Sequence, residues 1–140
     1  MPETDDEKIL AKCDLLREEL KDFFMYTTGI AYSLNYQEKV QDYVNGAKTR
    51  LTQFEKVITD KEWFMGKKVT YLDIMAFDVI DHQRILFPNI LDDFKAIGSF
   101  MERFEKLPSI KNYFNSSRFK KFPLWSERSF VGRSPQNLPK

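Results

Sequence analysis

The stretch Val69-Thr70-Tyr71-Leu72-Asp73-Ile74 has the pattern of an α-helix amino terminus. Thr70 occupies the N-cap position, and Asp73 is the acidic partner of a capping box in which aspartate replaces glutamate. The valine and isoleucine at the two ends of the stretch occupy the positions of a hydrophobic staple. The pattern predicts a helix over about residues 71–86, closed by Pro88. Because capping explains both polar side chains, we assign Thr70 and Asp73 to structure rather than chemistry.

Apolar residues recur at three- and four-residue steps on either side of this segment, which is helical periodicity. Further helices are predicted over about residues 5–34, 37–59, 91–106 and 109–116. After Phe119 the pattern fails, and three prolines together with Gly132 predict an extended tail over about residues 118–140. We therefore predict an all-α fold, a bundle of five or more helices with this tail, in a single domain spanning residues 1–140.

Composition narrows the possible partners and compartment. The 22 Lys and Arg residues nearly balance 21 Asp and Glu residues, so no overall charge favours nucleic acid or an acidic membrane. The apolar run at residues 74–77 is far shorter than a membrane span, and no secretory segment follows Met1. The single cysteine, Cys13, cannot form an internal disulfide. These features predict a protein of the reducing cytoplasm, with no nucleic-acid or membrane partner.

The chain also lacks the residues of several catalytic and metal sites. One histidine, His82, and one cysteine cannot build a His/Cys zinc site, and no nucleophile elbow or phosphate-binding glycine loop is present. The polar run Asp78, Asp81 and His82 lacks the pattern of a calcium loop, so we interpret it as a solvated helix face. No metal is predicted.

The segment GKKVTYLDIMAFD at residues 66–78 resembles the C-terminal domain of glutathione transferases. Three further stretches resemble the mu class in the same order and spacing: GIAYS at 29–33, FEKLPSIKNY at 104–113, and SSRF at 116–119 followed by FPL at 122–124. The resemblance covers nearly the whole chain. It implies a helical domain that forms much of an electrophile pocket, whereas glutathione is bound mainly by a preceding thioredoxin-like domain, of which these residues show no βαβ pattern.

The resemblance implies roles for two polar residues of the first helix. Tyr32 matches a mu-class tyrosine whose hydroxyl points into the electrophile site, where a neutral phenol can stabilise developing negative charge. The alternative is a half-buried tyrosine that anchors the helix. Asp22 matches an acidic residue that reaches the glutathione amino group of the partner subunit, and its alternative is a solvated charge. The arginine common in the family two residues later is Phe24 here.

The same resemblance extends the electrophile site to four more residues. Met25, Thr28 and Gly29 lie one to two helical turns before Tyr32 and are expected to line the same cleft. Methionine suits varied apolar ligands, although a methionine in a helix stripe is also an ordinary core residue. Ser126 matches a tail position that borders the pocket, and its alternative is a solvated serine.

The sequence supports two hypotheses about function, one enzymatic and one non-catalytic. The first is conjugation of glutathione, as co-substrate, to apolar electrophiles in detoxification, by a homodimer or together with a thioredoxin-like domain. By this reading the chain alone is inactive and binds glutathione poorly. The second is a non-catalytic module that binds apolar ligands or another protein. Its exposed apolar groups are predicted to be Phe23, Phe24, Tyr26 and the turn Trp63-Phe64-Met65.

Overall fold

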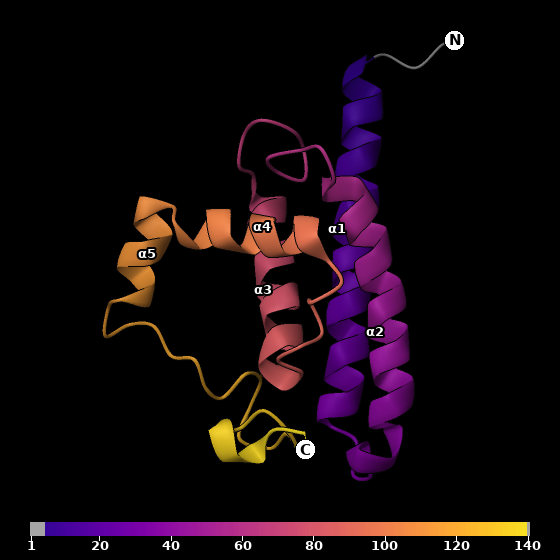
Figure 1. Ribbon diagram of the computed structural model, residues 1–140, viewed down its shortest axis with the longest axis vertical. Helices are drawn as coiled ribbons and strands as arrows, with labels where there is room; N and C mark the ends of the chain where they lie inside the picture. The colour runs from indigo at the N-terminus through magenta and orange to yellow at the C-terminus, as the bar shows by residue number, and fades with distance from the viewer. Residues whose placement is uncertain (1–4, 140) are drawn as a thin grey trace.

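The computed structural model describes residues 5–139. Within that range the chain forms no β-strand, and its helices are α1 (Asp5–Ala31), α2 (Tyr36–Ile58), α3 (Tyr71–Leu86), α4 (Lys95–Glu105), α5 (Pro108–Phe114) and the short 3-10 helix η1 (Pro135–Asn137). Helix α1 packs against α2 and α3, and α4 packs across α2 and α3 (Figure 1). The tail returns from α5 past the carboxyl end of α3 (Figure 1). The predicted all-α bundle with an extended tail is confirmed.

Aromatic side chains fill the centre of this bundle. The rings of Phe23 and Phe54 stack with centroids 6.0 Å apart, which joins α1 to α2. Trp63 and Phe64, from the loop after α2, both meet Phe100 of α4 edge-on. Phe23, Trp63 and Phe64 are buried, so the prediction that they form an exposed apolar patch is wrong. Within residues 5–139, no helix is both long and apolar enough to cross a membrane.

The capping box at the start of α3 is confirmed, and its carboxylate does more than cap. One oxygen of Asp73 accepts the backbone N–H of Thr70 at 2.7 Å, while the Thr70 hydroxyl accepts the N–H of Leu72 at 3.3 Å. The other Asp73 oxygen accepts the N–H of Phe64 at 2.9 Å. Asp73 is fully buried, so one carboxylate fixes both the helix start and the loop before it. The two residues of the predicted staple are both exposed.

A buried polar network joins the first three helices near the carboxyl ends of α1 and α3. The Tyr43 hydroxyl of α2 donates to Gln83 Oε1 of α3, and Gln83 Nε2 donates to Thr27 Oγ1 of α1 at 2.9 Å. The Thr27 hydroxyl donates to the carbonyl of Phe23 at 2.8 Å, and Gln83 Nε2 also donates to the carbonyl of Val79 at 3.1 Å. Burial raises the pKa of Tyr43 to about 12. Every polar hydrogen of the network therefore has an acceptor.

Two helix ends differ from the sequence prediction because distant residues determine them. Helix α4 begins at Lys95 rather than near residue 91, since the Glu55 carboxylate of α2 accepts the N–H groups of Ala96 and Ile97, each at 2.8 Å. These are first-turn N–H groups that have no acceptor within their own helix. Helix α1 ends at Ala31 rather than near residue 34, because the tail occupies its last carbonyl, as described below.

Candidate functional site between the end of α1 and the tail

Two hydroxyl groups meet where the carboxyl end of α1 faces the tail. Tyr32, the first residue after α1, is 42% exposed, and its hydroxyl donates to Ser126 Oγ at 2.9 Å. Ser126 Oγ also accepts the backbone N–H of Arg128 at 3.1 Å. Within residues 5–139 the Ser126 hydroxyl has no acceptor of its own. The Ser126 O–H group, polarised by the two hydrogen bonds that its oxygen accepts, can thus donate to a third group.

The tail is held against the end of α1 by backbone and side-chain contacts. The N–H of Phe130 donates to the carbonyl of Ala31 at 2.7 Å, and Val131 is buried beside Ala31. Gly132 has a φ of +80°, and a Cβ there would lie 2.8 Å from the Trp125 ring, so a larger residue would be strained and crowded. These contacts keep the Ser126 hydroxyl beside Tyr32. Sequence reasoning identified Gly132 only as a turn signal.

His82 does not lie on a solvated face, which corrects the prediction for this residue. It is only 9% exposed, because the Trp125 ring covers it with centroids 5.1 Å apart, and the Phe24 ring lies 6.4 Å from it. His82 Nδ1 and Trp125 Nε1 are both buried without a partner in the described residues. Burial lowers the pKa of His82, and the charges of Asp78 and Asp81 oppose that shift. The imidazole is thus kept neutral beneath the tail.

We expect His82 to make the folded protein sensitive to mild acid. Its pKa is lower in the folded state than in the unfolded chain, so its contribution to stability is complete above about pH 6.5. That contribution is lost as the pH falls from about 6.5 through the folded pKa, because the unfolded chain takes up the proton first. Urea unfolding of the wild type and His82→Gln at pH 7.5 and pH 5 measures the difference. An equal loss of stability in both proteins on acidification would contradict the assignment.

Met25 and Gly29 line a groove between α1 and α2, to which no described residue of the tail contributes. The groove has a volume of about 360 Å³ and includes Tyr43 from α2. Met25 and Gly29 are both exposed. Thr28 is not among the lining residues of this groove, and its hydroxyl donates to the carbonyl of Phe24 at 2.9 Å.

Asp22 lies on the same helix, nearer to its amino terminus than Met25 and Gly29. It precedes Tyr32 by ten positions, which corresponds to about 15 Å of helix rise. Its carboxylate is 70% exposed and forms an ion pair with Arg50 of α2, at 3.3 Å from Nη2. Sequence reasoning missed Arg50, which also places its guanidinium carbon 3.9 Å from the Tyr26 ring centroid. The carboxylate is exposed enough for an ammonium group to reach it from solvent.

The structure therefore brings only part of the predicted site together. Tyr32 and Ser126 form a hydrogen-bonded pair, and Met25 and Gly29 share a groove with α2. Thr28 and Asp22 stand apart from both pairs. The ligand-binding roles of all six residues stay predictions. Within residues 5–139, no three His, Cys, Asp or Glu side chains are grouped closely enough to hold a metal ion.

Comparison with known proteins identifies similar chains. Residues 21–117 match the family model for the glutathione S-transferase C-terminal domain. Glutathione S-transferase Mu 2 of Mus musculus is 34% identical over 128 residues, which cover 91% of this chain and 58% of that protein. Glutathione S-transferase Mu 4 of Homo sapiens is 35% identical over 130 residues, covering 93% and 59%. This chain thus spans somewhat more than half the length of these relatives.

Two solved structures share the fold. The Pi-class glutathione S-transferase of Onchocerca volvulus superposes with a TM-score of 0.76 at 24% identity, over 91% of this chain and 62% of the other. Rat hPGDS complexed with a quinoline gives a TM-score of 0.63 at 21% identity, over 81% of this chain and 60% of the other. At these identities the superpositions support the helical fold alone.

Proposed function

Because this chain belongs to the glutathione transferase family through that family's C-terminal domain, we propose that it forms the electrophile-binding half of a mu-like enzyme. The reaction joins the sulfur of glutathione to an apolar electrophile. We further propose that the active protein is a cytoplasmic homodimer in detoxification, and that a thioredoxin-like domain binds the glutathione.

The hydrogen bond between Tyr32 and Ser126 is the observation that supports this proposal most directly. As the thiolate of glutathione adds to an electrophile, a new C–S bond forms and negative charge moves onto the electrophile. A neutral phenol beside that charge stabilises it by donating a hydrogen bond, without ionising itself. Tyr32 is exposed enough for a ligand to reach, and without a ligand its hydroxyl donates to Ser126 Oγ at 2.9 Å. In this proposal Tyr32 turns its hydroxyl from Ser126 to the substrate.

The remaining predicted residues take supporting roles in the proposal. Met25, Thr28 and Gly29 would extend the apolar side of the electrophile site along α1. Asp22, exposed and paired only with Arg50 among the described residues, would receive the ammonium group of a glutathione bound to the partner subunit. The electrophile and the glutathione bound to the partner subunit would both be held in part by other segments, so both roles depend on the assembled enzyme.

The proposal is tested by joining the chain to the thioredoxin-like domain of a mu-class relative and assaying glutathione conjugation to an activated aryl halide. We expect Tyr32→Phe to lower kcat about tenfold or more, with little change in the KM for glutathione, because one transition-state hydrogen bond is lost. Tyr113→Phe on α5 is the matched control, since Tyr113 is 41% exposed.

An inert fusion that still forms the glutathione thiolate would contradict the proposed activity. Equal rates for the wild type, Tyr32→Phe and Tyr113→Phe would instead leave the activity standing and refute the role of Tyr32. Retention of the unfused chain on immobilised glutathione would contradict the need for a second domain.

A further inference from the structure

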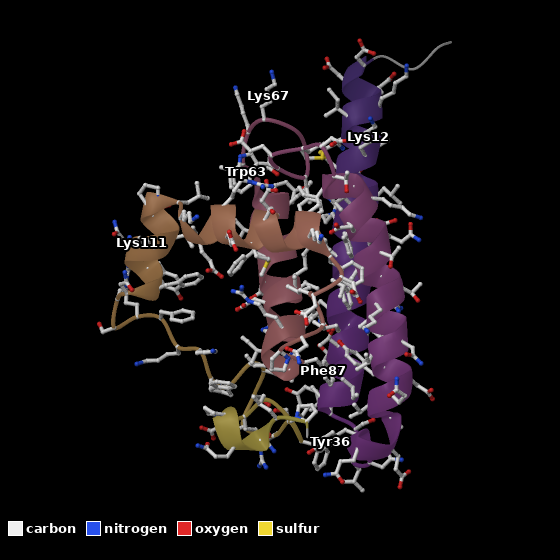
Figure 2. All side chains as sticks on the ribbon, in the orientation of Figure 1. Lys12, Tyr36, Trp63, Lys67, Phe87 and Lys111 are labelled. Atoms are coloured by element: carbon white, nitrogen blue, oxygen red, sulfur yellow. The ribbon has the colours of Figure 1, made fainter. Side chains whose placement is uncertain are left out.

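The tail docks on the helices through a small apolar cluster that is separate from the main core. Three buried residues form its centre, one from α1, one from α3 and one from the tail: Ala31, Leu86 and Val131. Partly buried side chains pack against them: Tyr36, Phe87, Leu124, Trp125 and Leu138. Figure 2 shows Tyr36 and Phe87 beside the returning tail. Because the cluster is small, each contact of the tail contributes a large share of its docking.

Two nitrogen atoms at the contact between His82 and Trp125 have no partner. The ring centroids are 5.1 Å apart, and His82 Nδ1 and Trp125 Nε1 are both buried without a hydrogen bond in the described residues. An indole N–H only donates, whereas a neutral imidazole has one acceptor nitrogen and a protonated imidazole has none. His82 Nε2 lies 4.0 Å from Asp78 Oδ1, which favours the proton on Nε2 and leaves Nδ1 as the acceptor. The neutral ring therefore complements Trp125, and the protonated ring does not.

Little around His82 compensates a positive charge. The charges that act on it are Asp78 and Asp81 of its own helix. The Asp78 side chain is 65% exposed, so water screens it, and Asp81 already pairs with Arg84 at 2.6 Å. The rings that lie against His82 from α1 and from the tail carry no charge. Attraction of an imidazolium to the indole face opposes the cost of burial, but it leaves the new ring N–H without an acceptor.

We propose that His82 is a pH-sensitive switch of the tail, which is docked while neutral His82 accepts the indole hydrogen of Trp125, directly or through one water molecule, and released when His82 is protonated. Ser126 follows Trp125 in the chain, so release of the tail separates the Ser126 hydroxyl from Tyr32. The site between α1 and the tail is thus assembled at neutral pH and opened by mild acid. As regulation of that site the inference rests on the proposed function, whereas the movement of the tail does not.

The direction of the pH dependence follows from burial. Burial lowers the pKa of His82 in the folded protein. Docking of the tail is therefore complete above about pH 6.5, the ordinary value for histidine, and is lost as the pH falls through the folded pKa.

The test follows two NMR signals of the isotope-labelled full chain between pH 8 and pH 5. Because the chain has one histidine, its ring C–H signals report the protonation of His82 alone. The backbone N–H of Phe130 donates to the Ala31 carbonyl at 2.7 Å, so its protection from hydrogen exchange, relative to the intrinsic rate at each pH, reports docking. We expect this protection to fall at least tenfold on the titration curve of His82. The N–H of Trp63, bonded to the Gly66 carbonyl at 2.9 Å far from the tail (Figure 2), should keep its protection.

Two variants separate the titration of His82 from its packing. His82→Gln is the matched control, because its amide oxygen accepts a hydrogen bond and does not titrate. In this variant the protection of Phe130 should stay constant from pH 8 to pH 5. Trp125→Phe removes the indole donor and should reduce the protection of Phe130 at pH 7.5 already.

Protection of Phe130 that stays constant in the wild type, rises in acid, or falls on a curve other than that of His82 would overturn the proposal. A parallel loss of protection at Trp63 would show general unfolding and would overturn it as well. A wild-type pH response retained in His82→Gln would refute the role of His82. An inert fusion with the thioredoxin-like domain would instead refute the proposed function and leave the movement of the tail standing.

Discussion

Asp73→Ala is expected to lower the free energy of unfolding by about 3 kcal/mol, because two backbone N–H groups lose their acceptor at once. One is the N–H of Thr70 at the start of α3, and the other is the N–H of Phe64 in the preceding loop. Phe64 and Asp73 are both buried, so water does not replace the lost acceptor. The thermal midpoint, followed by circular dichroism at 222 nm, should fall by roughly 10 °C.

Two further substitutions separate capping from the loss of charge. Asp73→Asn keeps one acceptor oxygen but turns an NH₂ group toward the other N–H, so about half of the destabilisation should remain. Asp78→Ala removes an exposed carboxylate from the same helix and should change stability by about 0.5 kcal/mol or less. A thermal midpoint of Asp73→Ala equal to that of Asp78→Ala would refute the structural assignment of Asp73.

Tyr43→Phe is expected to cost about 2 kcal/mol, because Gln83 Oε1 is left buried without a donor. Tyr43 is itself buried between α1 and α3, and the substitution changes almost no volume. The loss therefore measures the polar network rather than packing. Urea denaturation of the wild type and the variant at pH 7.5 provides the comparison.

A double-mutant cycle with Gln83→Leu tests whether the network acts as a unit. In Gln83→Leu the Tyr43 hydroxyl can turn to Thr27 Oγ1, which lies 2.9 Å away. In the double variant neither partner remains, so no buried polar atom is orphaned. The double variant should be more stable than the sum of the single losses predicts, by about 1 kcal/mol. Strict additivity would show that the two groups are not coupled.

The raised pKa of Tyr43 predicts that the folded protein loses stability in strong base. The pKa of Tyr43 is raised to about 12 in the folded protein, above its ordinary value of 10. Its contribution is complete below about pH 10 and is lost as the pH rises toward 12, because the unfolded chain ionises first. Tyr43→Phe should lack this part of the alkaline destabilisation. Other tyrosines and lysines are common to both proteins, so the difference between them isolates Tyr43.

Features that depend on neighbouring residues were predictable from the chain. The periodicity of apolar residues predicted five helices, and the spacing of Thr70 and Asp73 predicted the capping box, since all of its partners lie within a few positions. The resemblance of residues 66–78 to glutathione transferases agrees with the family match over residues 21–117.

Features that join distant segments were not predictable, because no local pattern encodes them. Three polar side chains on one helix indicate a solvated face, yet Trp125 covers His82 from a position 43 residues later. Helix α4 has no cap of its own, and Glu55 supplies one from another helix. Local spacing thus determined which segments are helical and where α3 begins. The burial of His82, the start of α4 and the meeting of Tyr32 with Ser126 came from chain folding, because each needs a partner that only packing brings near.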